Sequence, residues 1–290
     1  MFAPGILIQA IVNGVLMGAV YALIALGLTL IYGVLHIINF AHGALLTAGL
    51  FAVYFAHKVL GLDPYVAVFG IAPLSFAFGY GLQRFVVGPA AHGDDRNVML
   101  VTLGLAIMIE NLLLYAFHAD TRTIDVPAGY NVVDVDGALL GVSRLVGFGA
   151  VIVLTLLLWA LMKLTDTGKA IRAVAKERLG AELSGIDVAH IYAVTFGFGT
   201  ACLGIAACLL IPTFYVNPTV GQSFILVAFT IVVLGGMGSV TGALLGGLLV
   251  GVIESLGGLF LGETLGQLCI FLVFILVLLV RPTGLFGARA

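Results

Sequence analysis

Polar side chains that could hold a ligand or a proton lie inside long apolar stretches of this sequence. Glu110 and Asn111 are in the middle of stretch 98–118, and Glu254 lies within stretch 239–261. An ionised carboxylate at mid-bilayer costs about 2.5–3.5 kcal/mol on insertion scales, so such groups usually face other helices or a water-filled path. We expect Glu110 and Asn111 to line a translocation path; the alternative is a structural carboxyl that is paired or protonated. Glu254 lies nearer the outer interface, where the cost falls.

A second polar segment separates the first two apolar stretches. Residues 36–43 read HIINFAHG, with two histidines and an asparagine. The simplest interpretation is a short cytoplasmic turn. The alternative is a broken helix facing a cavity, because non-helical backbone at membrane depth needs protein or water around it. In that case Asn39, Phe40 and His42 join the candidate path. Asn13, in the first stretch, is interpreted as an interhelical hydrogen-bonding residue.

The sequence lacks the motifs of several enzyme classes. A Walker A motif needs glycine five residues before the Gly168–Lys169 pair, and that position is Lys163. The six histidines form no HExxH motif, and the three cysteines have no CxxC spacing. We therefore expect no catalytic site, no metal site and no cofactor bound by this chain.

Composition defines the class of protein. The chain has 290 residues, of which 62% are hydrophobic and 9% are charged, and its mean hydropathy is +1.22. Soluble domains carry about 25% charged residues. The formal net charge of −2 also argues against a nucleic-acid partner, which would require a basic surface. The sequence therefore predicts an all-α polytopic membrane protein with one transmembrane domain over residues 1–290.

Apolar stretches give the number of membrane-spanning helices. A helix needs about 20 apolar residues to cross the hydrocarbon core. The stretches predict a bundle of about 8–10 transmembrane helices, and the first is long enough to contain a kink near Gly27 or Gly33. They cover residues 5–33, 43–57, 65–88, 98–118, 145–163, 190–211, 223–236, 239–261 and 266–280.

Basic residues set the orientation, because Lys and Arg accumulate in short cytoplasmic loops. Five of the 12 basic residues lie in segment 163–178. If that segment lies in the cytoplasm and successive loops alternate between the two sides of the membrane, three basic residues lie outside: Lys58, Arg122 and Arg144. Segment 119–144 then becomes the largest outer loop. The same alternation places the N-terminus outside and the C-terminus inside.

The main polar segment, 165–189, has a helical pattern. Asp166 or Thr167 can cap a helix, and a second short helix would end at Gly185, a favourable residue after a helix. The segment either only sets the topology or docks a cytoplasmic partner. Its apolar positions are Ile171, Val174 and Ala175, and its basic positions on the other side are Lys169, Arg172 and Lys176.

Glycine is unusually frequent, with 39 residues. Small residues let membrane helices approach closely, and this packing replaces the hydrophobic effect between lipid-solvated helices. Block 234–251 reads LGGMGSVTGALLGGLLVG and contains consecutive GxxxG steps. It predicts a flat face for helix packing, and a sliding interface is the alternative. The packing candidates are Gly238, Gly242, Gly246, Gly247 and Gly251.

Three blocks together resemble the permease subunits of bacterial ABC importers for branched-chain amino acids. They are INFAHG at 38–43, GKAIRAVAKERLGAELSGID at 168–187 and LGGMGSVTGALLGG at 234–247. In that family the cytoplasmic loop docks onto an ATPase subunit. The strict Glu-Ala-Ala signature with its following glycine is not reproduced here, which puts individual contacts in doubt. The coupling residues that the resemblance implies are Gly168, Arg172, Ala173, Glu177, Ala181 and Gly185.

The resemblance also implies partners and a mechanism. It implies a second, non-identical permease subunit, two ATPase subunits that carry ATP and Mg²⁺, and a periplasmic substrate-binding protein. The chain would lie in the lipid of the bacterial inner membrane and form half of an alternating-access path. The alternatives are a permease for urea or amides and an ion-coupled secondary transporter, for which Glu110 and Glu254 would be the coupling acids.

Overall fold

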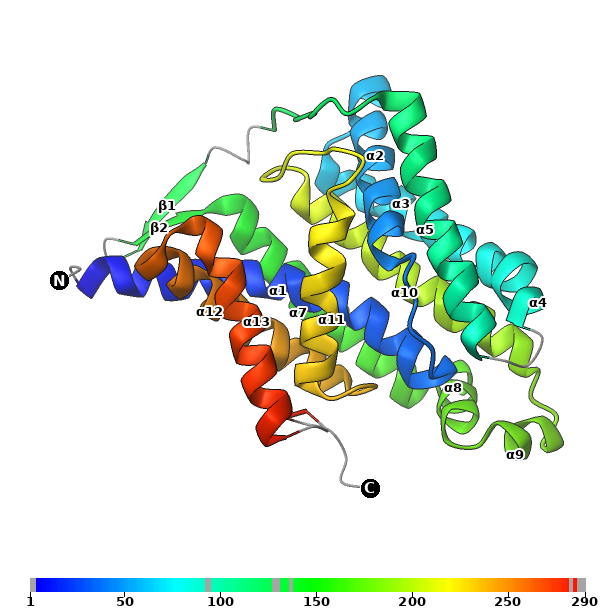
Figure 1. Cartoon of the computed structure of the whole chain (residues 1–290). Helices are drawn as coiled ribbons and strands as arrows, with labels where there is room; N and C mark the ends of the chain where they lie inside the picture. Colours follow the sequence, from blue (N-terminus) through cyan, green and yellow to red (C-terminus); the bar gives the residue numbers. More distant parts are fainter. Residues whose placement is uncertain (1–3, 92–94, 127–130, 136–137, 282–283, 286–290) are drawn as a thin grey trace.

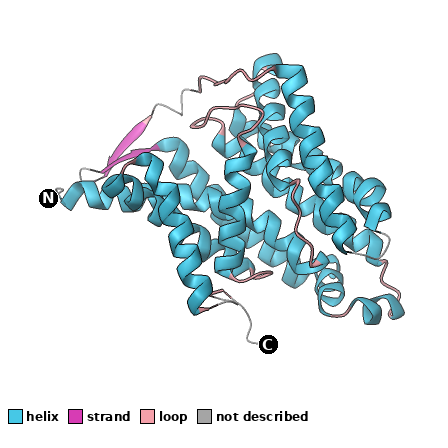
Figure 2. Cartoon of the chain, viewed as in Figure 1, coloured by secondary structure: helices cyan, strands magenta, loops and turns pink. Residues whose placement is uncertain are grey.

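The computed structural model describes residues 4–91, 95–126, 131–135, 138–281 and 284–285. The described chain is a helical bundle with one small hairpin (Figures 1 and 2). Seven of its helical segments are long and apolar enough to cross a membrane, and two shorter apolar helices, Gly221–Gly235 and Thr264–Val280, accompany them. These nine segments match the nine predicted stretches and confirm the polytopic helical class.

The elements follow one another along the chain with short connections. They are α1 (Pro4–Leu35), α2 (His42–Leu60), α3 (Pro64–Leu82), the π-helical turn η1 (Gln83–Val87), α4 (Gly88–Ala91), α5 (Asp95–Phe117), β1 (Val132–Val135), β2 (Ala138–Gly141), α7 (Val142–Leu164), α8 (Asp166–Lys176), α9 (Arg178–Leu183), α10 (Val188–Leu210), α11 (Gly221–Gly235), α12 (Val240–Leu261) and α13 (Glu263–Val280).

The predicted outer loop 119–144 contains structure that the sequence did not indicate. Strands β1 and β2 pair antiparallel, with Val132 opposite Gly141. Upstream, Arg122 exchanges two backbone hydrogen bonds with Val216, each 2.8 Å long, which ties this segment to the loop before α11. Strands of four residues are too short to give a clear alternating pattern, so they read as loop.

The predicted kink in the first stretch is wrong, because α1 is one continuous helix of 32 residues. Gly27 and Gly33 serve close packing instead of a bend. A Cβ atom at Gly27 would lie 2.6 Å from the carbonyl oxygen of Gly199 in α10, and one at Gly33 would lie 3.1 Å from the Cα of Gly238. Helices α1 and α10 are buried along most of their length and form the centre of the bundle.

Helix α12 runs antiparallel to α1 with their backbones in contact. A Cβ atom at Gly18 would lie 2.6 Å from the carbonyl oxygen of Gly247, and one at Gly14 would lie 2.8 Å from that of Gly251. Side chains larger than hydrogen do not fit at these crossings. This contact favours a fixed packing interface over a sliding one.

The other glycines of the predicted face have different neighbours. Gly242 and Gly246 face α11, where they meet Gly235 and Ile231. Each helical residue is rotated by 100° from the previous one, so Gly246 and Gly247 point to different helices. Gly238 precedes α12 and has a φ of +84°, so it forms the turn rather than the helix face. The single predicted face therefore serves two helices and a turn.

The α1–α12 contact makes a testable prediction. Gly18→Ala places a methyl group against the backbone of Gly247, so we expect it to lower the stability of the bundle by about 1–3 kcal/mol, as overpacking does. Gly149→Ala is the matched control, since no atom lies within 4 Å of its Cβ position. Thermal unfolding of the purified protein in detergent measures both. Equal melting temperatures for the two variants would contradict the close contact.

Candidate functional site

The segment between α1 and α2 is a buried, extended connection. It follows His36, whose φ is +56°, and runs to Ala41. Nε2 of His42 lies 2.9 Å from the carbonyl oxygen of Ile24, a residue near the middle of α1. The segment therefore turns back along α1, and α2 starts well inside the bundle. This geometry supports the broken-helix interpretation and not the short cytoplasmic turn.

Local hydrogen bonds explain this conformation. Oδ1 of Asn39 accepts the backbone N–H of Ala41 at 3.0 Å, and the Asn39 carbonyl accepts that of His42 at 3.3 Å. Asn39 and His42 are both fully buried, so they hold the segment in place. The backbone N–H of Gly221 donates to Oγ1 of Thr47 at 3.0 Å, which brings the start of α11 beside the start of α2.

Phe40 links this segment to two further helices. Its backbone N–H donates to Oγ1 of Thr102 in α5 at 3.3 Å. Its ring stacks on Phe229 of α11, with the ring centroids 6.5 Å apart. Phe40 is half-buried, whereas Asn39 and His42 are not accessible. Of the three predicted path residues in this segment, Phe40 alone has an accessible side chain.

Glu110 has a polar partner that sequence reasoning missed. Nε2 of Gln222, in the first turn of α11, donates to both carboxylate oxygens of Glu110 at 2.8 and 2.9 Å. This pair joins α5 to α11, the two helices that Phe40 also contacts. Asn111 instead donates to the carbonyl of Ile107 in its own helix at 2.8 Å. The signal for Gln222 was its position as a polar residue directly before stretch 223–236.

Residues 165–187, which we call the coupling segment after the role that the resemblance implies, contain two short helices, α8 and α9, at the lower edge of Figure 1. Oγ1 of Thr165 caps α8 by accepting the backbone N–H of Gly168 at 3.0 Å, so neither Asp166 nor Thr167 is the capping residue. Ile171 and Val174 are buried, as predicted. The cap at Thr165 and the buried side chains of Ile171 and Val174 fix α8 against the bundle.

The six predicted coupling residues divide into two groups. Gly168, Ala181 and Gly185 shape the segment: Gly168 packs against the end of α7, Ala181 is buried, and Gly185 ends α9 with a φ of +83°. Arg172, Ala173 and Glu177 are exposed. Sequence reasoning missed two exposed leucines of α9, Leu179 and Leu183, which are 64% and 81% exposed.

Two carboxylates frame the coupling segment and remain charged. The hydrogen bond from Lys169, 2.9 Å long, and the charge of Lys169 hold the pKa of Asp166 below its usual value. The backbone N–H of His190 donates to Asp187 and lowers the pKa of that carboxyl, with a further contribution from Arg84. Both groups are therefore ionised at neutral pH, and both cap or begin helices.

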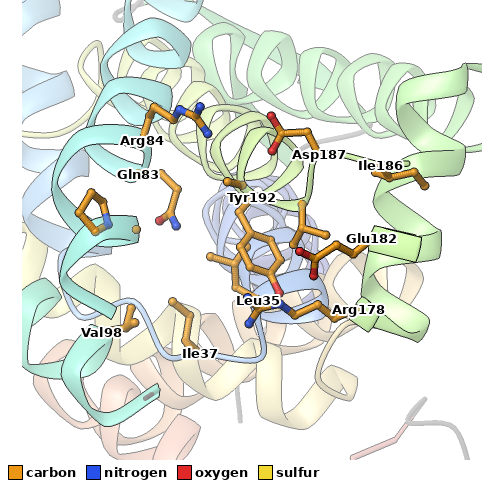
Figure 3. A pocket seen from close by; sticks show the side chains of 14 residues that line it. Leu35, Ile37, Gln83, Arg84, Val98, Arg178, Glu182, Ile186, Asp187 and Tyr192 are labelled. Atoms are coloured by element: carbon orange, nitrogen blue, oxygen red, sulfur yellow. The ribbon is translucent and has the colours of Figure 1, made fainter. Parts of the chain in front are cut away.

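A cavity of about 520 Å³ lies between α9 and the π-helical turn η1 (Figure 3). Arg178 and Glu182 of α9 line one side, and Arg84 of η1 lies with Asp187 on the other. Gln83 in the same π-helical turn is buried, and its Oε1 atom has no hydrogen-bond partner among the described residues. π-helical turns are frequent at functional sites. The cavity leaves space beside α9.

Comparison with known proteins gives a family. The sequence profile of the permease component of branched-chain amino acid transport systems matches residues 10–279. The chain belongs to this family. It is 33% identical to the high-affinity branched-chain amino acid transport system permease protein BraD of Pseudomonas aeruginosa, over 97% of this chain and 95% of BraD. No solved structure matches it.

Two further relatives extend the comparison. The high-affinity branched-chain amino acid transport system permease protein LivH of Escherichia coli K12 is 32% identical, over 97% of this chain and 95% of the relative. A probable branched-chain amino acid transport permease protein of Methanocaldococcus jannaschii is 26% identical, over 91% of this chain and 88% of the relative. The resemblance and the multi-pass inner-membrane location expected from the sequence are thereby confirmed.

The Glu110–Gln222 pair gives a second prediction. Gln222→Glu places two carboxylates together, so we expect uptake by the assembled transporter to fall about tenfold or more while the protein still inserts. The double variant Glu110→Gln/Gln222→Glu restores one donor and one acceptor and should recover most of the uptake. Lys58→Glu, an exposed change at the end of α2, is the control. A double variant as inactive as Gln222→Glu would contradict a role for the pair.

Proposed function

We propose that this chain is one permease subunit of an ATP-driven importer for branched-chain amino acids. It forms half of an alternating-access path, and a partner ATPase drives it through α8 and α9. The observation that carries this proposal is the accessible face of the coupling segment, in a chain that belongs to the permease family. Arg172, Ala173 and Glu177 on α8 and its end, with Leu179 and Leu183 on α9, form this face, which we call the docking face.

The docking face has the chemistry of a protein contact. Leu179 and Leu183 are four residues apart, so they lie on one side of α9. Exposed leucines flanked by charged residues mark interaction sites. Ala173 leaves a shallow position beside Arg172, where a partner can approach the helix closely. The opposite side of the segment is held by Ile171, whose side chain is buried.

The partners follow from this assignment. Two ATPase subunits would bind ATP and Mg²⁺, because the sequence has no P-loop of its own. A second permease subunit, similar to this chain but not identical to it, would complete the path. A periplasmic substrate-binding protein would deliver the amino acid to the outer face. No nucleic acid takes part.

The mechanism places movement at the coupling segment. The cavity between α9 and η1 gives α9 room to shift when the ATPases close on ATP. Helices α1 and α12 have no such room, because their backbones touch at Gly18 and Gly247. We therefore assign the movement to α9 and the fixed frame to the α1–α12 pair.

The sequence analysis left two alternative functions, an ion-coupled carrier and a permease for urea or amides. An ion-coupled carrier is not favoured by the family to which the chain belongs. In addition, Glu110 is occupied by Gln222 and is not a free coupling acid. A permease for urea or amides would use the same docking face, and substrate uptake by the reconstituted transporter distinguishes it. Competition of labelled leucine uptake by isoleucine and valine, with none by urea or acetamide, is the expected result.

The docking face makes a third prediction. Arg172→Glu and the double variant Leu179→Ala/Leu183→Ala should lower ATP-dependent leucine uptake at least tenfold and release the ATPases during purification, because they remove charge and apolar contact from the face. Lys58→Glu, an exposed change at the end of α2, is the control. Normal uptake and normal co-purification in the docking variants would contradict the proposal.

A further inference from the structure

A second cavity opens between the N-terminal half of α1, the start of α7 and the C-terminal half of α12. Its volume is about 510 Å³, within the range of about 300–1,000 Å³ that holds small molecules. The charged side chains that line it are one arginine, Arg144, and one glutamate, Glu254. This cavity is separate from the docking face and from the Glu110–Gln222 pair.

Arg144 is oriented but not neutralised. Its Nη1 atom donates to Oδ1 of Asn13 across the α1–α7 contact at 3.2 Å, as expected for an interhelical asparagine. A guanidinium group has five N–H donors, so this bond leaves others for a ligand carboxylate. Among the described residues, Lys169–Asp166 is the one ion pair, and Arg144 takes part in none.

Glu254 faces the same cavity from α12. Its carboxyl group interacts with the hydroxyl of Tyr21 in α1, a neutral partner. It forms no ion pair with Arg144 in the described chain, although both line one cavity. Two opposite charges inside a membrane-spanning region are costly and face protein or a water path. Here Arg144 donates to the neutral Asn13, Glu254 lies near the neutral hydroxyl of Tyr21, and the two charges form no ion pair among the described residues.

The remaining wall of the cavity is largely apolar. Met17 of α1, Phe214 before α11 and Leu259 of α12 line it. Phe214 packs edge-on against Phe224, with ring centroids 5.6 Å apart, and Tyr21 packs against the same ring at 6.1 Å. These aromatic contacts fix one side of the cavity. A branched aliphatic side chain matches this surface.

We infer that this cavity is a binding site for a zwitterionic α-amino acid within the permease. Arg144 binds the carboxylate, Glu254 binds the ammonium group, and the wall of Met17, Phe214 and Leu259 contacts the aliphatic side chain. The inference rests on the proposed function, since the cargo class comes from there. It adds a selecting site in this chain, in addition to any selection by a soluble binding protein.

The test pairs each charge of the ligand with one residue. Binding of tritiated leucine to the assembled transporter in lipid nanodiscs is competed with 4-methylpentanoate, which lacks the ammonium group, and with 3-methylbutylamine, which lacks the carboxylate. We expect Glu254→Gln to weaken leucine binding about tenfold or more and leave 4-methylpentanoate unchanged. Arg144→Gln should weaken leucine similarly and leave 3-methylbutylamine unchanged. Lys58→Gln, outside the cavity, should change none of the three.

The outcomes separate this inference from the proposed function. If the wild-type transporter shows no saturable leucine binding, or if each variant weakens all three ligands equally, the cavity is not a zwitterion site. Leucine uptake by the same preparation would then still support the proposed function. If the wild type imports no branched-chain amino acid, the proposed function itself fails. Arg144→Lys, which keeps the positive charge, should retain more leucine binding than Arg144→Gln.

Discussion

The structure depends on the close approach of α1 to its two main neighbours. Gly27 lets α10 contact one side of α1, and Gly14 and Gly18 let α12 contact another. Between lipid-solvated helices such packing is the principal attraction, because burial from water contributes little. Helix α1 is therefore straight, buried and nearly enclosed. The connection from Leu35 to His42 must then fold back along it.

This frame positions polar groups at its edges. The returned segment brings Phe40 beside α5 and α11, where the Glu110–Gln222 pair lies. At the other side of α1, its antiparallel contact with α12 brings Tyr21 and Glu254 together. Helix α9 borders a cavity of about 520 Å³, whereas α8 is held by the buried side chains of Ile171 and Val174.

The sequence predicted the elements that have long apolar stretches or a clear helical spacing of apolar residues. Hydropathy gave nine apolar helices, and helical spacing placed Ile171 and Val174 on the buried side of α8. Sequence patterns could not predict which side chains pair across the bundle, because residues such as Gln222 and Glu110 are far apart in the chain. Gly238 illustrates a second limit, since a GxxxG pattern does not reveal that its first glycine lies in a turn. The short strands β1 and β2 carried no detectable pattern.

We expect α9 to move on ATP binding while the α1–α12 pair stays fixed. Spin labels at Ser184, after α9, and Pro89, in α4, report the distance across the cytoplasmic cavity in a variant with Cys269 replaced by serine. Labels at Ile8 and Leu261 report the α1–α12 pair. In the assembled transporter we expect ATP with vanadate to change the first distance by several ångströms and leave the second unchanged. A fixed first distance, or a change in the second, would contradict the account.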